Sequence, residues 1–179
     1  MTVSPDTLPR MSVEEYLDYE HSQDVRHEFV DGYLYAMTGA SERHERIAAN
    51  LLISLGMHLR GSPCRAYKGD LKLTVGEDHY YPDVFVTCGP DRPDGYSRDD
   101  PVVIAEVLSP STARNDRGDK RLAYESLETL SEYVLVWQDR TRVEVRRRGE
   151  PEPQVLESLD DVLRLDSIDF AVPLGELYA

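Results

Sequence analysis

Two apolar segments of the chain each carry one carboxylate near the middle. "YYPDVFV" (80–86) holds Asp83, and "VVIAEVL" (102–108) holds Glu106. Such runs predict buried strands, where an uncompensated carboxylate costs several kcal/mol. Acids on neighbouring strands can share a hard cation, Mg²⁺ or Mn²⁺, which activates a water for attack on a phosphodiester. The alternative is two acids that are solvated or paired with arginine.

The elements around these acids predict a mixed β-sheet flanked by helices, in the α/β to α+β range. Ser12 and Glu15 match a capping box that begins a helix in "SVEEYLDYE". Asp31-Gly32 is a two-residue turn that joins two short strands within 26–37, an N-terminal hairpin. Residues 41–61 carry the apolar stripe of a long helix, which we expect Gly61 to end.

The second half of the chain supplies most of the predicted sheet. "CRAYKGDLKLTV" and "HYYPDVFVTC" predict two strands joined by the short loop "GEDH". Pro82 predicts an irregular backbone that places Asp83 near the rim of the sheet. The run with Glu106 predicts a central strand, followed by a helix in "KRLAYESLETL", a strand in "EYVLVW" and an outer antiparallel strand in "RVEVRRR". Residues 1–10 are expected to form a flexible arm, and residues 11–179 a single domain.

Composition limits the partners and the compartment. The net charge is −14 with a pI near 4.7, which argues against general affinity for polyanions but leaves room for a local basic surface. Cys64 and Cys88 have no metal-type spacing, so we expect neither a zinc site nor a disulfide framework, and a reducing cytosol. No signal peptide or membrane-length apolar run is found, which favours a cytoplasmic protein.

The motif "YPDVFV…VVIAEVLSPST…DRGDKRLAYES" resembles the PD-(D/E)XK nuclease superfamily, and most closely its Uma-type group of restriction-endonuclease-like proteins. The likeness runs from about residue 11 to about residue 148. It implies a restriction-endonuclease-like fold in which Asp83 and Glu106 bind the metal, with the main-chain carbonyl of Val107 completing the shell. Glu28, in "RHEFVDG", matches an acidic residue that the group carries upstream.

The chain departs from the superfamily pattern at one position. The lysine expected two residues after the glutamate is replaced by Leu108, and the resemblance implies that Lys120, on the following helix, takes its role. A flexible ammonium can reach a site from a neighbouring element, where it would orient the attacking water and stabilise charge on the phosphate. Lys72, which shares a strand face with Asp70, is the rival lysine.

Other residues are candidates for lining the site. His44 lies on the buried stripe of the long helix, where a histidine is either a core residue or a group that positions a phosphate or a water. Asp116 and Tyr124 lie one helical turn on either side of Lys120. Arginine forks suit phosphates, and the candidates for holding a DNA backbone are Arg114, Arg117 and Arg121, with the run Arg146, Arg147 and Arg148 as a second cluster.

These features favour a metal-dependent endonuclease that cuts DNA, expected as a homodimer by analogy with restriction enzymes. A non-catalytic interaction module that keeps the nuclease fold is the main alternative, favoured by the missing lysine after Glu106 and by the acidic composition. A metal-dependent hydrolase of RNA or nucleotides is the second. No base-reading motif is recognisable, so the sequence predicts no recognition site.

Overall fold

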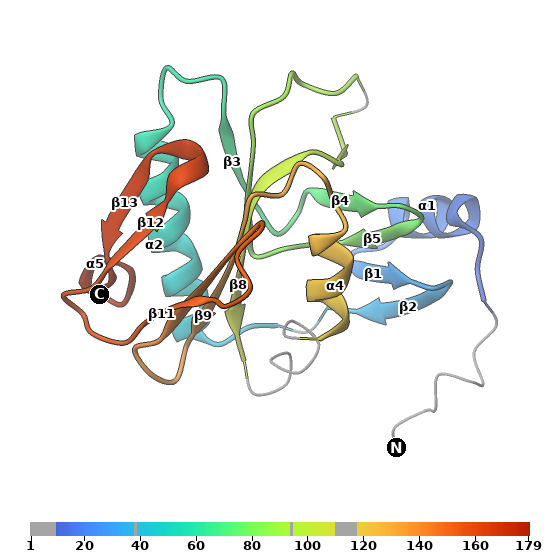
Figure 1. Ribbon diagram of the computed structural model, residues 1–179. Coiled ribbons are helices and arrows are strands. Elements are labelled where there is room, and N and C mark those ends of the chain that lie inside the picture. Colours follow the sequence, from blue (N-terminus) through green and yellow to red (C-terminus); the bar gives the residue numbers. More distant parts are fainter. Residues whose placement is uncertain (1–9, 38, 94, 110–117) are drawn as a thin grey trace.

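The computed structural model describes residues 10–37, 39–93, 95–109 and 118–179 (Figure 1). The helices are α1 (Val13–His21), α2 (Glu42–His58), α4 (Asp119–Glu125) and α5 (Leu174–Leu177), with a short 3-10 helix η2 (Asp166–Ile168). The strands are β1 (His27–Val30), β2 (Tyr33–Ala36), β3 (Arg65–Lys68), β4 (Lys72–Val75), β5 (Asp78–Tyr80), β6 (Val84–Thr87), β7 (Ser97–Arg98), β8 (Pro101–Leu108), β9 (Glu132–Trp137), β10 (Val143–Arg147), β11 (Gln154–Leu156), β12 (Val162–Leu165) and β13 (Phe170–Pro173).

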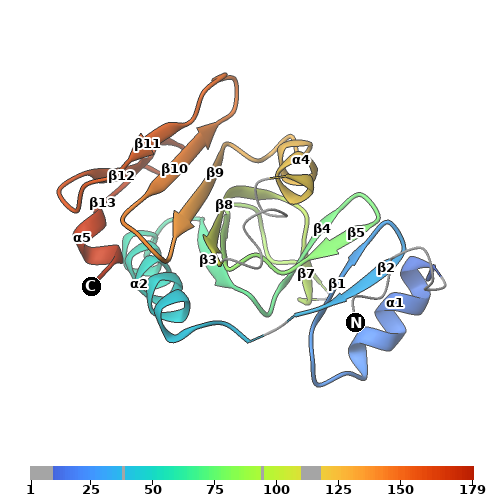
Figure 2. The same ribbon diagram turned by 90° about the horizontal axis from the view of Figure 1, so that it is seen from below.

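A six-stranded mixed sheet with the order β11-β10-β9-β8-β6-β3 forms the middle layer. Its central strand β8 pairs antiparallel with β6 and parallel with β9, and is buried along almost its whole length. One face packs against α2 and the β12-β13 hairpin, and the other against α4 and the five-stranded sheet β2-β1-β5-β4-β7 (Figure 2). Two apolar cores therefore lie on opposite faces of β8, which explains its continuous hydrophobic run.

The local signals at the N-terminus are confirmed. Ser12 and Glu15 form both hydrogen bonds of a capping box, and Asp31-Gly32, both with positive φ, turns β1 into β2. The long helix buries Ile47, Leu51 and Leu55 as its stripe predicts, but ends at His58, before Gly61. The predicted arm 1–10 lies outside the described residues except for Arg10, whose guanidinium pairs with Asp31 at 2.6 Å.

The prediction of two continuous strands between residues 64 and 88 was wrong. The chain forms four strands there: β3 and β6 belong to the six-stranded sheet, whereas β4 and β5 belong to the five-stranded sheet. The two sheets separate at Gly69–Leu71 and at Tyr81–Asp83. Proline interrupts a ladder because it has no N–H, so Pro82 is a physical cause of this break. Asp83 consequently lies where the two sheets separate, in the irregular backbone that the sequence predicted.

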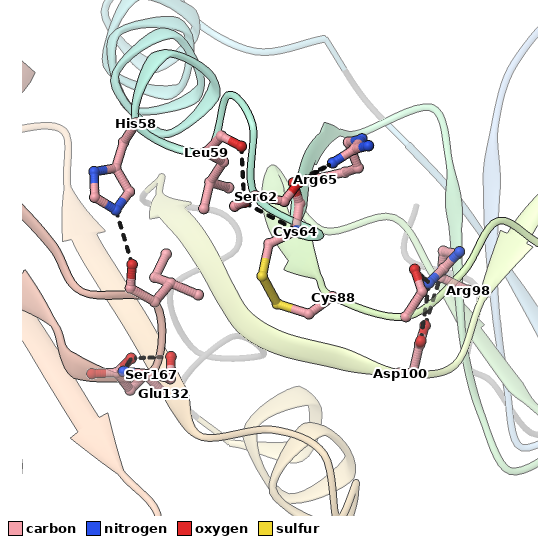
Figure 3. The surroundings of a disulfide bond; sticks show 12 residues. His58, Leu59, Ser62, Cys64, Arg65, Cys88, Arg98, Asp100, Glu132 and Ser167 are labelled. Carbon is pink, nitrogen blue, oxygen red and sulfur yellow. Dashed lines mark hydrogen bonds and ion pairs between the residues drawn. A yellow bond between two sulfur atoms is a disulfide. The ribbon is translucent and has the colours of Figure 1, made fainter.

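The expectation of two unpaired cysteines was also wrong, because Cys64 and Cys88 form a disulfide (Figure 3). The antiparallel register of β3 and β6 pairs Arg65 with Thr87, and the next positions outward are the two cysteines. This register depends on contacts between distant segments, which cysteine spacing does not encode. Within the described residues, no helix combines the length and the hydropathy that a membrane span requires.

Candidate active site

Asp83 and Glu106 are brought together by the antiparallel pairing of β6 and β8. The main-chain N–H of Asp83 donates to Glu106 Oε2 at 3.1 Å, and the N–H of Val107 donates to Asp83 Oδ2 at 2.7 Å. The Glu106 side chain is 5% exposed and the Asp83 side chain 24% exposed, so the site opens on the side of Asp83. Each carboxylate is thus oriented by the backbone of the strand that carries the other.

Lys120, from the first turn of α4, supplies positive charge beside these acids. Its Nζ lies 2.7 Å from Glu28 Oε1 and 3.7 Å from Glu106 Oε1. Glu28 comes from β1 and also accepts the N–H of Tyr81 at 3.4 Å. The Lys120 and Glu28 side chains are only 16% and 14% exposed, so the pair is shielded from bulk water. A cation held here offsets part of the cost of burying Glu106.

Tyr124, which also lies on α4, orients the Oε1 oxygen of Glu106. Its hydroxyl donates to Glu106 Oε1 at 3.1 Å, and its ring packs edge-on against the rings of Tyr80 and Tyr133. Burial and the nearby carboxylates raise the pKa of Tyr124 well above its ordinary value, so the phenol stays a proton donor at neutral pH.

His44 faces the site from the first turn of α2. Its Nε2 lies 3.2 Å from Asp83 Oδ2, which argues for a polar contact rather than an apolar core position. Burial lowers the pKa of His44, but the hydrogen bond and charge of Asp83, together with Glu45 and the Val107 main chain, outweigh it, and the net direction is upward. The main chain of Val107 thus contacts both residues: its carbonyl accepts from His44, and its N–H donates to Asp83.

The oxygens of this cluster suit a hard divalent cation in type. Asp83 and Glu106 offer carboxylates, and a residue's C=O in a strand points to the same side as its N–H, so Val107 directs its carbonyl toward Asp83. Among the described residues, no three His, Cys, Asp or Glu side chains are grouped so that they could hold a metal ion. A shell built from these strands therefore needs the Val107 carbonyl beside two carboxylates.

The structure separates the two candidate lysines. Lys72 places its ammonium 5.5 Å from the ring centroid of Tyr16, and Asp70 is exposed in the β3-β4 connection. Arg121 pairs with Glu125 along α4. Asp116, Arg114 and Arg117 fall outside the described residues, so their predicted roles rest on the sequence alone.

The sequence analysis did not identify Glu20, a further acidic residue that supports the site. Glu20 of α1 is buried and accepts hydrogen bonds from the Tyr81 hydroxyl at 2.9 Å and from the main-chain N–H of His27, also at 2.9 Å. It thereby ties α1 to β1 and to the segment just before Asp83. Its position one helical turn after the buried Tyr16 was a signal for it, because residues four apart share a helix face.

The arrangement of the sheets and helices is that of the restriction-endonuclease-like fold. It matches the crystal structure of "a putative nuclease belonging to DUF820" from Anabaena variabilis with a TM-score of 0.80 and 17% identity, covering 94% of this chain and 97% of that one. The family model "Uma2: Putative restriction endonuclease" matches residues 13–174, and the chain belongs to this family.

Two relatives come from Synechocystis sp. The uncharacterized protein slr1290 is 34% identical over 176 residues, covering 96% of this chain and 93% of its own length. The uncharacterized protein sll1609 is 32% identical over 143 residues, covering 77% of this chain and 81% of its own.

Proposed function

We propose that this protein is a metal-dependent endonuclease that hydrolyses phosphodiester bonds of DNA through a PD-(D/E)XK-type site. The observation that carries the proposal is that Asp83, Glu106 and Lys120 lie close together where the two sheets separate. Membership of the family described as "Putative restriction endonuclease" supports it. A cation clamped between acids and an amine is suited to phosphoryl chemistry, where charge stabilisation dominates.

Asp83, Glu106 and the Val107 carbonyl would hold Mg²⁺ or Mn²⁺, with Glu28 acting directly or through water. The bound ion supplies stabilisation of charge on the phosphate and lowers the pKa of a water molecule. Lys120, held in place by its ion pair with Glu28, orients the attacking water and stabilises the developing negative charge. His44 donates to Asp83 and fixes the orientation of that carboxylate, while Tyr124 does the same for Glu106.

Plasmid nicking with Mg²⁺ or Mn²⁺ tests the proposal. Wild-type protein should nick the plasmid, and EDTA, Asp83→Ala or Glu106→Ala should abolish cleavage. Asp18→Ala, which removes an exposed acid on α1, is the matched control and should cleave normally. Lys120→Met should lose activity by at least about a hundred-fold, whereas Lys72→Met should retain it. The opposite result for the two lysines would assign the catalytic amine to Lys72.

Calorimetry with Mg²⁺ and Mn²⁺ separates the metal site from the chemistry. Binding by the wild type that vanishes in Glu106→Ala supports the site even before a substrate is found. RNA and nucleotides tested beside DNA distinguish the nuclease from the second alternative. If every divalent ion leaves plasmid, single-stranded DNA and RNA intact, the non-catalytic interaction module becomes the better explanation.

The proposal extends to assembly and compartment. We expect a homodimer that aligns two active sites on one duplex, and sedimentation equilibrium measures this directly. We expect the protein to act on DNA in the cytoplasm, a compartment in which thiols are normally kept reduced. Rapid alkylation of cell lysates followed by mass measurement would establish whether Cys64 and Cys88 are thiols or a disulfide in the cell.

A further inference from the structure

A pocket of about 290 Å³ opens where α4, β9 and β10 meet, separate from the acids of the candidate active site. Arg121 lines it from α4, Tyr133 from β9 and Arg146 from β10. Tyr133 and Arg146 are cross-strand partners, so their side chains leave the sheet on the same face. This is the face that α4 covers.

The pocket is connected to the active site through two aromatic rings. The ring of Tyr133 packs edge-on against the ring of Tyr124, with 5.6 Å between centroids, and the Tyr124 hydroxyl reaches Glu106. The first turn of α4 also presents successive cations, with Lys120 at the acids and Arg121 at the pocket. A ligand long enough to lie across α4 could therefore contact both places.

Arg146 lines this pocket without an ion pair to any described residue. Its Nε is buried and has no hydrogen-bond partner among the described residues, a state that it shares with the Nε of Arg147. A buried donor without a partner destabilises a fold, and such a group in a native structure calls for an explanation. Three glutamates, Glu125, Glu132 and Glu150, also line the pocket. Glu125 pairs with Arg121 and Glu132 with Arg147, and among the described residues no carboxylate forms an ion pair with Arg146. An external anion would satisfy it.

A second arginine holds positive charge in the pocket without a carboxylate. Arg148 donates from Nε to the Leu130 carbonyl at 2.7 Å and from Nη2 to the Leu127 carbonyl. These acceptors are neutral, and among the described residues Arg148 forms no ion pair. Arg147, the residue between Arg146 and Arg148, also lines the pocket but lies 3.3 Å from Glu132 and 3.6 Å from Asp166.

We infer that this pocket binds a backbone phosphate of the DNA strand, away from the phosphate that is cleaved. Arg146 and Arg148 would contact the phosphate oxygens, because a guanidinium fork matches their geometry, whereas the charge of Arg121 at the rim is balanced by Glu125. The inference rests on the proposed nuclease function for the identity of the polyanion. Arg146 of β10 would then hold the substrate strand where that strand crosses α4.

Fluorescence anisotropy of a labelled DNA duplex, titrated in EDTA so that no cleavage occurs, tests the pocket. Arg146→Met should weaken binding about ten-fold, since a charge-assisted hydrogen bond is lost. It should also make the slope of log K against log salt less negative by about 0.9. Arg60→Met removes an exposed arginine just beyond α2 and is the matched control, expected to bind like the wild type.

Thermal unfolding separates a binding role from a structural one. Because the buried Nε has no partner to lose, the melting temperature of Arg146→Met should be equal to or above that of the wild type. Arg146→Lys, which keeps the charge and removes the fork, should show an intermediate loss of affinity. DNA affinity unchanged in both Arg146 variants overturns the inference, as does an affinity loss matched by Arg60→Met.

The two proposals fail in different ways. Protein that never cuts DNA in Mg²⁺ or Mn²⁺, but whose binding is weakened by Arg146→Met, refutes the nuclease and supports the pocket. Protein that cuts DNA, with the same affinity in the wild type and in Arg146→Met, supports the nuclease and refutes the pocket.

Discussion

Replacing Lys120 with methionine tests the geometry of the site independently of catalysis. Lys120 Nζ lies 2.7 Å from Glu28, and the two side chains are 16% and 14% exposed. At this distance and an effective dielectric constant of about 20, the Coulomb attraction is about 6 kcal/mol. Desolvation of both groups cancels much of it. We therefore expect Lys120→Met to lower the free energy of unfolding by about 2 kcal/mol, and the melting temperature by about 4–8 °C.

The chain contains a matched control for this experiment. Lys68 Nζ lies at the same 2.7 Å from Glu45 Oε2, but these side chains are 47% and 48% exposed. Solvent screening reduces such a pair to at most about 0.5 kcal/mol, so Lys68→Met should leave the stability almost unchanged. The two pairs have the same chemistry and the same separation, so the comparison tests burial together with the second contact of Lys120, 3.7 Å from Glu106.

Urea unfolding followed by circular dichroism in EDTA provides the measurement, since chelation removes any stabilisation by bound metal. A double-mutant cycle of Lys120→Met with Glu28→Gln should give a coupling energy of about 1–2 kcal/mol. If Lys120→Met lowers the free energy of unfolding no more than Lys68→Met does, and the coupling energy with Glu28 is near zero, the amine does not lie between the acids. The catalytic role proposed for it would then have no structural basis.

Three further outcomes are expected. Tyr124→Phe removes the donor to Glu106 and should slow plasmid cleavage about ten-fold, whereas an unchanged rate would mean that this hydrogen bond does not orient the carboxylate. Burial and then the nearby Lys72 charge lower the pKa of His79 to about 4 from 6.5, so the unfolded chain binds the extra proton in this interval. The free energy of unfolding therefore loses nothing through His79 above pH 6.5 and falls by up to about 3 kcal/mol as the pH drops to 4. Urea unfolding of His79→Phe across these pH values should show a smaller decrease in this free energy at acid pH than the wild type. Reduction of the disulfide between Cys64 and Cys88, which are 24 residues apart, should cost about 3 kcal/mol in the same assay, with Cys64→Ser/Cys88→Ser matching the reduced protein and unaffected by reductant.

Features that depend on a few neighbouring residues were predictable from the sequence. The capping box at Ser12 and the hairpin at Asp31-Gly32 involve backbone groups at most three residues apart. The continuous apolar run around Glu106 correctly indicated a strand covered on both faces, because two cores of the protein pack against β8. The irregular backbone at Pro82 was predictable for the same reason, since a missing N–H acts locally, but the division into two sheets at that point was not predicted.

Features that depend on which strands become neighbours were not predictable. The separation of β3 from β4 is decided by pairing with β6 and β5, and hydrophobic alternation is the same whichever sheet receives the strand. The same register places Cys64 opposite Cys88. Arg146 was visible only as part of a basic run, and the lack of a partner for its Nε is a property of the packed structure. The roles of the predicted site residues stay predictions until the variants are assayed.

The net charge of −14 limits how DNA can be bound rather than whether it can. At physiological salt the Debye length is about 8 Å, so a bound phosphate responds mainly to the cations of the pocket and of α4. At about 0.01 M salt it is about 30 Å, and the acidic remainder of the protein repels the duplex. Lowering the salt should therefore strengthen binding less than it does for a basic protein. With about three phosphates neutralised, we expect a log K against log salt slope no steeper than about −3, measured by anisotropy in EDTA. A slope typical of six to ten contacts, about −5 to −9, would require a basic surface beyond the pocket and α4.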